Sequence, residues 1–471
     1  MKHNDDPEKS RVSDAGAGET SADPARKIDR RHFLASGASL IALGSASFLS
    51  AKAFADQSSS DPMRVPGSPA RVYGERSPLE SAARSVGDFH SLTPLQDLHG
   101  IITPSSLHFE RHHNGVPAID PSRHRVLVHG LVARPLFFTV DDLHRFPSVS
   151  RLVFIECAGN SRNGWGIAED RTVQDMHGLT STSEWTGVKL ATLLDAAGLK
   201  PEASWILAEG ADAAALTRSV PLTDEVLSEA MVCYAQNGEA LRPEQGYPVR
   251  LVLPGFEGNI NVKWLRRLKV GSSSFMTRWE TAKYTDLMPD GTAYQFSLVM
   301  EAKSVITSPS GGQQMRRGFQ EIRGLAWSGR GRVVGVEVTV DGGRTWHRAE
   351  LQEPVLSKCH TRFRMAWTWN GEETILQSRC VDQTGYRQPS RAALIKVRGI
   401  HSNYHYNAIQ SWKIERDGRV SNLHGHTITE TLKKGVRNER SVIRRDEKRN
   451  VLPALMLHLD RTTPPAAQLG N

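Results

Sequence analysis

The chain has 471 residues, of which 39% are hydrophobic and 23% charged, so it has the composition of a globular protein with room for two or three domains. Its formal net charge is +8, and half of that excess lies in residues 425–471, which hold nine basic and five acidic side chains. The small charge elsewhere argues against a nucleic acid partner, which would need a dense basic face. No uninterrupted run of 18 apolar residues occurs, so we expect no membrane-spanning helix in the mature protein.

The N-terminal segment carries the features of an export signal. Arg30 and Arg31 precede a mildly apolar run rich in Gly, Ala and Ser, which ends in small residues at Ala55. This order predicts a twin-arginine signal peptide over residues 1–55 and a periplasmic protein that is exported in folded form. The alternative is an ordinary secretory signal with a chance arginine pair. Residues 56–90, rich in Ser, Pro and charged side chains, indicate a linker or arm.

Residues 91–297 mix helix and strand signals and predict an α+β domain. Apolar residues recur at helical spacing over 190–197, and Gly198 follows where the helix should end. Short apolar runs predict strands at residues 126–130, 152–155, 205–208 and 249–253.

Residues 298–402 change to a strand-rich pattern. Valines alternate with other residues from Val334 to Val340, and the turn sequence Asp341-Gly342-Gly343 follows. Further short strands separated by turns predict a β-sandwich of the immunoglobulin type. We expect residues 403–424 to close the fold, and the charged tail at 425–471 has no predicted role.

Four cysteines are widely spaced and form neither CxxC nor CxxCH, so the sequence signals no structural zinc site and no covalent haem. Their even number permits disulfides, and Cys359 with Cys380 would be the local pair. Cys157 differs in context, because it ends an apolar run and precedes Ala158-Gly159-Asn160. Small neighbours would let a bulky ligand approach a metal-binding thiolate, although a lone cysteine at a strand end is more often a buried small hydrophobe.

The sequence around this cysteine, Phe154-Ile155-Glu156-Cys157-Ala158-Gly159-Asn160, resembles the signature of the molybdenum-ligating cysteine in the sulfite oxidase family. The resemblance extends from about residue 91 to residue 424. It implies a sulfite-oxidase-type molybdopterin-binding domain, with Cys157 as the metal ligand, followed by an immunoglobulin-like domain that forms a homodimer. Within the family, residues 95–104, 183–187 and 404–412 look most like the molybdenum subunit of sulfane dehydrogenases.

The resemblance also implies residues that act on the substrate. Residues 109–113 are similar to the family's Phe-x-Arg-x-His motif, which implies Arg111 as a substrate-binding arginine that also contacts the cofactor. Arg162, five residues after the cysteine, matches a second anion-binding arginine, and Tyr284 matches the active-site tyrosine. Ser161 stands where sulfite oxidases tend to carry another arginine, and this departure puts free sulfite in doubt as the preferred substrate.

Further cofactor contacts are implied by short matches along the first domain. The family's His-Gly-Phe-Pro-Val-Arg resembles residues 245–250, where Gln replaces His and can form a hydrogen bond but cannot become cationic. Three histidines, His108, His112 and His113, would by themselves be interpreted as surface side chains. They would form a poor zinc site, because neighbouring side chains diverge along an extended segment. Beyond Arg111 and Cys157, the implied cofactor contacts are Phe109, His113, Asp212, Gln245, Arg250, Asn261 and Lys263.

The implied chemistry is oxygen-atom transfer on a molybdenum–molybdopterin cofactor. Because the chain has no haem motif, its electrons would leave to a cytochrome c subunit. The substrate could be sulfane sulfur on a carrier protein or free sulfite, and a third reading is a sulfur-binding or scaffolding subunit without turnover. The joint presence of the cysteine, arginines and tyrosine argues against that third reading. Residues 162–177 are an insertion relative to the family and lie beside the site, so the resemblance does not define the substrate pocket.

Overall fold

The computed structural model describes residues 63, 66–166 and 170–423. The predicted export signal and the tail at 425–471 therefore lie outside the described residues. The elements discussed below belong to one unit that begins at Glu80. In this part of the chain, no helix is both long enough and apolar enough to cross a membrane.

Two five-stranded sheets, antiparallel except for the β4–β13 pair, combine with helices in the first domain, which is therefore an α+β fold, as predicted. The first sheet has the order β11-β10-β7-β6, with β12 also paired to β10, and the second has the order β5-β4-β13-β8-β9. Their bounds are β4 Arg125–Gly130, β5 Leu136–Thr139, β6 Ser148–Glu156, β7 Thr180–Lys189, β8 Trp205–Gly210, β9 Thr217–Pro221, β10 Met231–Gln236, β11 Glu239–Ala240, β12 Arg250–Val252 and β13 Leu265–Gly271.

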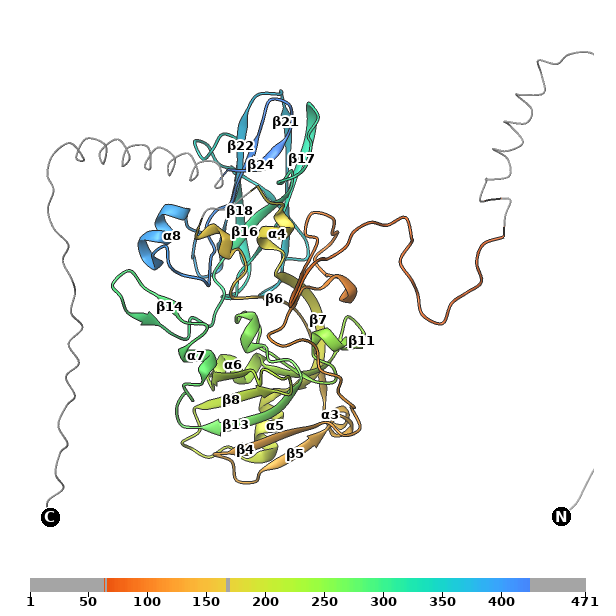
Figure 1. Ribbon diagram of the computed structural model, residues 1–471, viewed down its shortest axis with the longest axis vertical. Helices are drawn as coiled ribbons and strands as arrows, with labels where there is room; N and C mark the ends of the chain where they lie inside the picture. Colours follow the sequence, from red (N-terminus) through yellow and green to blue (C-terminus); the bar gives the residue numbers. More distant parts are fainter. Residues whose placement is uncertain (1–62, 64–65, 167–169, 424–471) are drawn as a thin grey trace, which may run out of the picture. The chain divides into compact units, whose positions relative to one another are not determined.

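Helix α5 (Leu190–Ala197) fills the space between these sheets (Figure 1). Its four apolar residues at i, i+3, i+4 and i+7 are all fully buried, as the spacing predicts. The helix ends at Gly198, whose φ of +72° is available to glycine without the steric cost of a side chain. The other helices of this domain are short: α3 Val140–Arg145, α4 Val173–His177, α6 Asp224–Glu229 and α7 Arg278–Thr281.

The second domain is a β-sandwich, as predicted from the valine alternation, which places Val336 and Val338 in the buried face. Val334 departs from this pattern and is exposed, and the pairing of its strand shifts register between Val333 and Gly335. One sheet has the order β16-β17-β21-β20 and the other β19-β18-β22-β23-β24 (Figure 1). Trp327 from the first sheet and Trp412 from the second are fully buried in the shared core. The bounds are β16 Lys303–Ser308, β17 Gly318–Trp327, β18 Val333–Thr339, β19 His347–Arg348, β20 Glu350–Gln352, β21 Thr361–Trp369, β22 Thr374–Asp382, β23 Ser411–Ile414 and β24 Val420–Asn422.

Several details differ from the sequence-based expectations. The closing segment supplies β23 and β24 to the sandwich, and helix α8 (Arg391–Arg398) lies within the predicted strand-rich region. A small sheet of β1 (Ser85–Gly87), β2 (His90–Leu92) and β3 (Glu110–Arg111) begins inside the segment expected to be a linker. A short hairpin, β14 (Asp286–Leu287) and β15 (Ala293–Tyr294), follows the first domain.

The disulfide that the sequence permitted between Cys359 and Cys380 is not formed. All four cysteines are buried and free. Cys359 precedes β21 in one sheet of the sandwich, whereas Cys380 lies within β22 of the other sheet. The two cysteines are therefore close in the sequence but do not form a disulfide in the folded protein.

Candidate functional site

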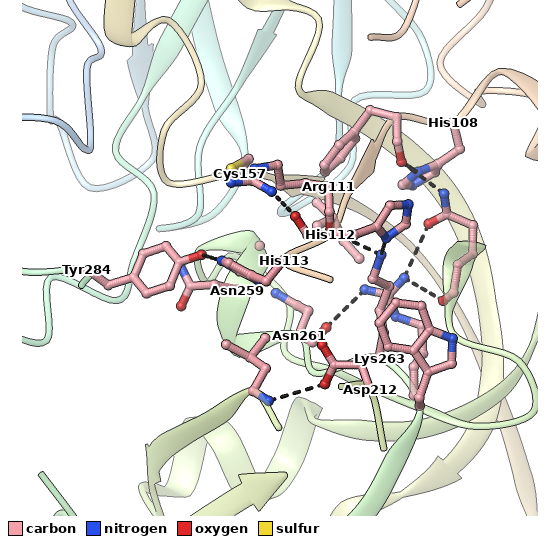
Figure 2. Close-up of a pocket in the computed structure, with 17 residues that line it drawn as sticks. His108, Arg111, His112, His113, Cys157, Asp212, Asn259, Asn261, Lys263 and Tyr284 are labelled. Carbon is pink, nitrogen blue, oxygen red and sulfur yellow. Dashed lines mark hydrogen bonds between the residues drawn. The ribbon is translucent and has the colours of Figure 1, made fainter. Parts of the chain in front are cut away.

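A cavity opens among the loops of the first domain (Figure 2). Ten of the eleven residues that the sequence nominated line this cavity, although they come from segments far apart in the chain. The lining residues are His108, Phe109, Arg111, His112, His113, Ile155, Cys157, Asp212, Leu216, Gln245, Arg250, Gly258, Asn259, Asn261, Lys263, Trp264 and Tyr284.

Cys157 enters the cavity from the end of β6. Its N–H donates to the Leu179 carbonyl at 3.0 Å, and its own carbonyl accepts from the Asn160 N–H at 2.8 Å, so the backbone forms a tight turn. Burial raises the pKa of the Cys157 thiol, while the nearby Gly159 N–H and the Arg111 cation act in the opposite direction. Figure 2 shows the Arg111 side chain beside the sulfur.

Residues 108–113, around β3, supply three histidines. Two of them are buried, whereas the sequence suggested that they lie at the surface. His108 is 1% exposed and His112 is 5% exposed. Burial lowers the pKa of His108 to about 3, so it is a neutral ring at physiological pH. His112 forms a 2.8 Å contact with the Glu110 carboxylate. The extended backbone of this segment sends successive rings in different directions, and no set of three His, Cys, Asp or Glu side chains that could hold a metal occurs within the described ranges.

Lys263 and Arg250 form a cationic wall. The Lys263 ammonium donates to the Glu244 carbonyl at 2.9 Å and the Arg111 carbonyl at 3.2 Å, and it lies 2.9 Å from Nδ1 of His112. Burial, together with the neighbouring Arg250 charge, lowers the pKa of Lys263 to about 7. A lysine held this way gains a proton readily when an anion arrives, which suits a site for phosphate.

Arg250 is buried and held from three sides. Its guanidinium donates to the carbonyls of Gln245 at 2.9 Å and Asn261 at 3.1 Å, and it lies 4.6 Å from the Trp185 ring centroid. Gln245 in turn donates to the Phe109 carbonyl at 2.9 Å, so it ties the histidine segment to the cationic wall. The side-chain amide of Asn261 forms hydrogen bonds with nearby backbone groups, so this residue stabilises the shape of the wall.

Tyr284 and His113 form the opposite end of the cavity (Figure 2). The phenol oxygen lies 3.0 Å from Nε2 of His113. Burial raises the pKa of Tyr284 and lowers that of His113 to about 4, so at neutral pH a neutral phenol and a neutral imidazole share this hydrogen bond. The Arg218 guanidinium lies 5.0 Å from the Tyr284 ring centroid, and Tyr284 has a φ of +49°, a strained conformation that surrounding contacts must hold in place.

A network of buried charges supports this end from behind. The His405 ring lies 3.2 Å from the Glu257 carboxylate and 3.3 Å from that of Glu301. Burial alone would lower the pKa of His405, but the two carboxylates raise it to about 10. Glu257 also pairs with Arg218 at 3.1 Å, so the imidazolium is connected through one carboxylate to the cation beside Tyr284.

Arg162 is the one nominated residue that the structure places outside the cavity lining. It is exposed and does not line the cavity. Ser161 before it has a φ of +65°, and the Arg162 N–H donates to the Gly159 carbonyl at 3.2 Å, so the chain turns tightly at this point. Spacing from the cysteine could not reveal that turn.

Sequence reasoning missed several lining residues, of which Gly258 and Asn259 are the clearest. A parallel bridge between Glu156 and Glu257 places this segment beside Cys157, and a Cβ on Gly258 would lie 2.9 Å from the Glu156 carbonyl. Nothing in the local sequence connects two segments a hundred residues apart. Trp264 could have been nominated, since it directly follows Lys263.

The cavity fits a molybdopterin group. Two of its polar side-chain atoms are buried and lack a hydrogen-bond partner within the described part of the chain: Nε2 of His108 and Nε of Arg250. Such atoms are costly to bury unless a ligand satisfies them. A pterin with its phosphate offers many hydrogen-bonding atoms and negative charge, which match these atoms and the cations of Arg250 and Lys263, and a sulfur ligand is present at Cys157.

Comparison with known proteins agrees with this geometry. Residues 113–279 match the family described as the oxidoreductase molybdopterin binding domain, and residues 295–411 match the Mo-co oxidoreductase dimerisation domain. Sulfite oxidase of Gallus gallus is 32% identical over 331 residues, covering 64% of this chain and 71% of that protein. The chain belongs to the sulfite oxidase family.

The chain is also similar to two further proteins. Mitochondrial sulfite oxidase of Rattus norvegicus is 33% identical over 379 residues, covering 74% of this chain and 66% of the rat protein's length. The chain thus spans somewhat less than two thirds of that relative. A solved structure, the sulfane dehydrogenase SoxCD from Paracoccus pantotrophus, is 44% identical with a TM-score of 0.71, covering 74% of this chain and 95% of that one.

Proposed function

We propose that this chain is the molybdenum subunit of a periplasmic sulfane dehydrogenase, which oxidises sulfur bound to a carrier protein and passes the electrons to a cytochrome c. One observation carries the proposal. The Cys157 thiol, the exposed Arg111 side chain and the neutral Tyr284 phenol line the same cavity, and that cavity has a cationic wall. The identity of 44% to a sulfane dehydrogenase, against 32–35% for the sulfite oxidases, favours sulfane sulfur over free sulfite.

The cofactor would be held by residues from every side of the cavity. Cys157 would ligate the metal, while Arg250, Lys263 and His108 would meet the anionic and hydrogen-bonding atoms of the pterin. Bound there, the cofactor supplies oxygen-atom transfer and two-electron redox chemistry. The buried walls keep water from the pterin side of the cavity and strengthen each of these charge interactions.

The remaining side chains act on the substrate. The Arg111 guanidinium lies beside the Cys157 sulfur, donates to the His112 carbonyl, and has no acidic partner among the described residues, so its charge is available to bind and orient a sulfur anion. The Tyr284 phenol can donate a hydrogen bond without adding charge. His113, neutral at physiological pH, would donate from Nε2 to the phenol oxygen 3.0 Å away, which fixes the orientation of the phenol and leaves its hydrogen for the substrate.

The partners follow from what the sequence contains and lacks. The chain carries no CxxCH motif, so we expect a separate cytochrome c to accept the electrons one at a time. Residues 295–411, which match a dimerisation domain, would form the homodimer. The arginine pair at residues 30–31 would direct export of the folded protein to the periplasm.

The decisive experiment compares two substrates. The purified, molybdenum-loaded chain is mixed with cytochrome c and given either free sulfite or a carrier protein bearing sulfane sulfur on a cysteine, and reduction of the haem is followed by absorbance. We expect turnover with the carrier and at most a slow reaction with sulfite. Faster turnover with free sulfite would make this chain a sulfite dehydrogenase, and no turnover with either substrate in fully loaded protein would favour a non-catalytic subunit.

A further inference from the structure

A buried lysine of the second domain reaches into the loop that presents Cys157. Lys303, the first residue of β16, is 1% exposed. Its ammonium lies 3.0 Å from Oε1 of Glu156 and donates to Oγ of Ser161 at 2.7 Å. Glu156 and Ser161 are the two ends of the segment 156–161, here called the Cys157 loop. One cation therefore ties both ends of this loop to the β-sandwich.

Other contacts leave the loop little freedom. The Glu156 carboxylate is fully buried and also accepts from Nδ2 of Asn160 at 2.8 Å and from Nε1 of Trp327 at 2.7 Å. Ser161 lies in the left-handed region, at φ +65°, and its hydroxyl is 2.6 Å from Nδ1 of His177. A non-glycine residue stays in that conformation only when its surroundings fix it, and the Lys303 ammonium is one of the groups that do so.

Stability alone is a weak reason for this ion pair. Removing two charges from water costs about as much as their attraction returns, and well-packed apolar replacements of buried pairs are often neutral or stabilising. An apolar pair, however, could not form hydrogen bonds with the side-chain oxygens of Glu156 and Ser161, which lie on either side of Cys157 in the sequence. The geometry is that of a positioning group.

We propose that Lys303 is a positioning residue for Cys157, which sets the direction of the sulfur in the cavity and thereby couples the β-sandwich to the reaction centre. This inference rests on the proposed role of Cys157 as the metal ligand and does not depend on which sulfur compound is oxidised. It assigns the second domain a part in catalysis in addition to dimerisation.

The test replaces both charges together, because Lys303→Met alone would leave a buried carboxylate without a counter-charge. The double variant Lys303→Met/Glu156→Gln keeps the side-chain volumes and neutrality. In the full-length apoprotein, the rate of Cys157 alkylation by iodoacetamide is followed by peptide mass spectrometry. Because the loop loses its tie, we expect alkylation to be at least tenfold faster than in the wild type. In the loaded protein we expect kcat to fall tenfold or more with KM and pterin content within twofold of wild type.

Lys358→Met provides the matched control. Lys358 also belongs to the second domain, is 6% exposed, and its ammonium pairs with Glu225 and Glu229 of the first domain. Its backbone carbonyl accepts from the Phe154 N–H at 3.0 Å, a contact that the substitution leaves in place. We expect this variant to keep wild-type alkylation and turnover. Wild-type alkylation and kcat in the double variant would overturn the proposal. Faster alkylation in a preparation whose wild type turns over no sulfur substrate would support the positioning role and count only against the proposed function.

Discussion

Replacing Arg111 with Gln tests which of the two nominated arginines binds the substrate. Arg111 lines the cavity beside the Cys157 sulfur, and no acidic side chain within the described ranges neutralises it. Its backbone carbonyl, which accepts from Lys263 at 3.2 Å, is unchanged by the substitution, so the wall on the cofactor side should keep its contacts. The variant therefore removes a charge while leaving the cavity in place.

The expected size of the effect follows from exposure. A hydrogen bond from a cation to an anion is worth roughly 1.5–3 kcal/mol. Because the Arg111 side chain is exposed, solvent screening places the value near the lower end, about 1.4 kcal/mol, which corresponds to about tenfold in affinity. We expect Arg111→Gln to raise KM for the sulfur anion about tenfold while molybdenum content remains at the wild-type ratio.

The assay is steady-state reduction of cytochrome c against substrate concentration, with metal analysis of the same preparation. Arg162→Gln is the matched control, because Arg162 is exposed but lies outside the cavity lining, and its KM should be unchanged. An unchanged KM in Arg111→Gln, or an equal rise in Arg162→Gln, would refute the assignment. Loss of molybdenum from Arg111→Gln with an unchanged KM would instead make Arg111 a cofactor residue.

Three further substitutions probe the rest of the site. Cys157→Ser should give a folded protein without turnover, since a hydroxyl is a poor replacement for the sulfur ligand; retention of more than a few per cent of activity would remove Cys157 from the metal. Tyr284→Phe should lower kcat about tenfold to a hundredfold with KM little changed, because a hydrogen bond made in the transition state is lost; an unaltered kcat would make Tyr284 a packing residue. His405→Gln should cost about 3 kcal/mol at pH 6, as measured by urea unfolding, because the imidazolium between Glu257 and Glu301 is lost while Arg218 and Arg398 remain beside them. Because the pKa of His405 is raised from 6.5 to about 10 in the folded protein, its stabilisation is complete below pH 6.5 and is lost as the pH approaches 10, so the difference between wild type and variant should shrink over that range; a difference independent of pH would contradict a charged His405.

The parts of this protein that could be predicted from the sequence are those with a local signal. Helix α5 follows from four apolar residues at helical spacing and a terminal glycine, and the sandwich follows from valine alternation and turns. Within the site, residues carried by recognisable motifs, such as Cys157 and Tyr284, lie together in the cavity. The exposed position of Arg162 depends on the left-handed turn at Ser161, for which no glycine gave a sign.

Burial and long-range pairing had no such signal. His108 and His112 were taken as surface residues, yet both are buried, His108 against Trp185 with ring centroids 5.6 Å apart and His112 against Trp264 with ring centroids 5.9 Å apart. The Lys303–Glu156 pair joins residues 147 positions apart in two different domains. Lysines and glutamates are ordinarily surface residues, so only the assembled fold identifies this pair as buried.

The order in which the chain is made has a bearing on when the site can be completed. The His405 N–H donates to the Ala158 carbonyl at 2.9 Å, directly after Cys157, and β23 and β24 at residues 411–422 complete the neighbouring sheet. These segments are synthesised more than 240 residues after the cysteine. A nascent chain therefore has the thiol long before it has the segments that enclose it, so incorporation of the cofactor belongs after residues 405–422 have been made.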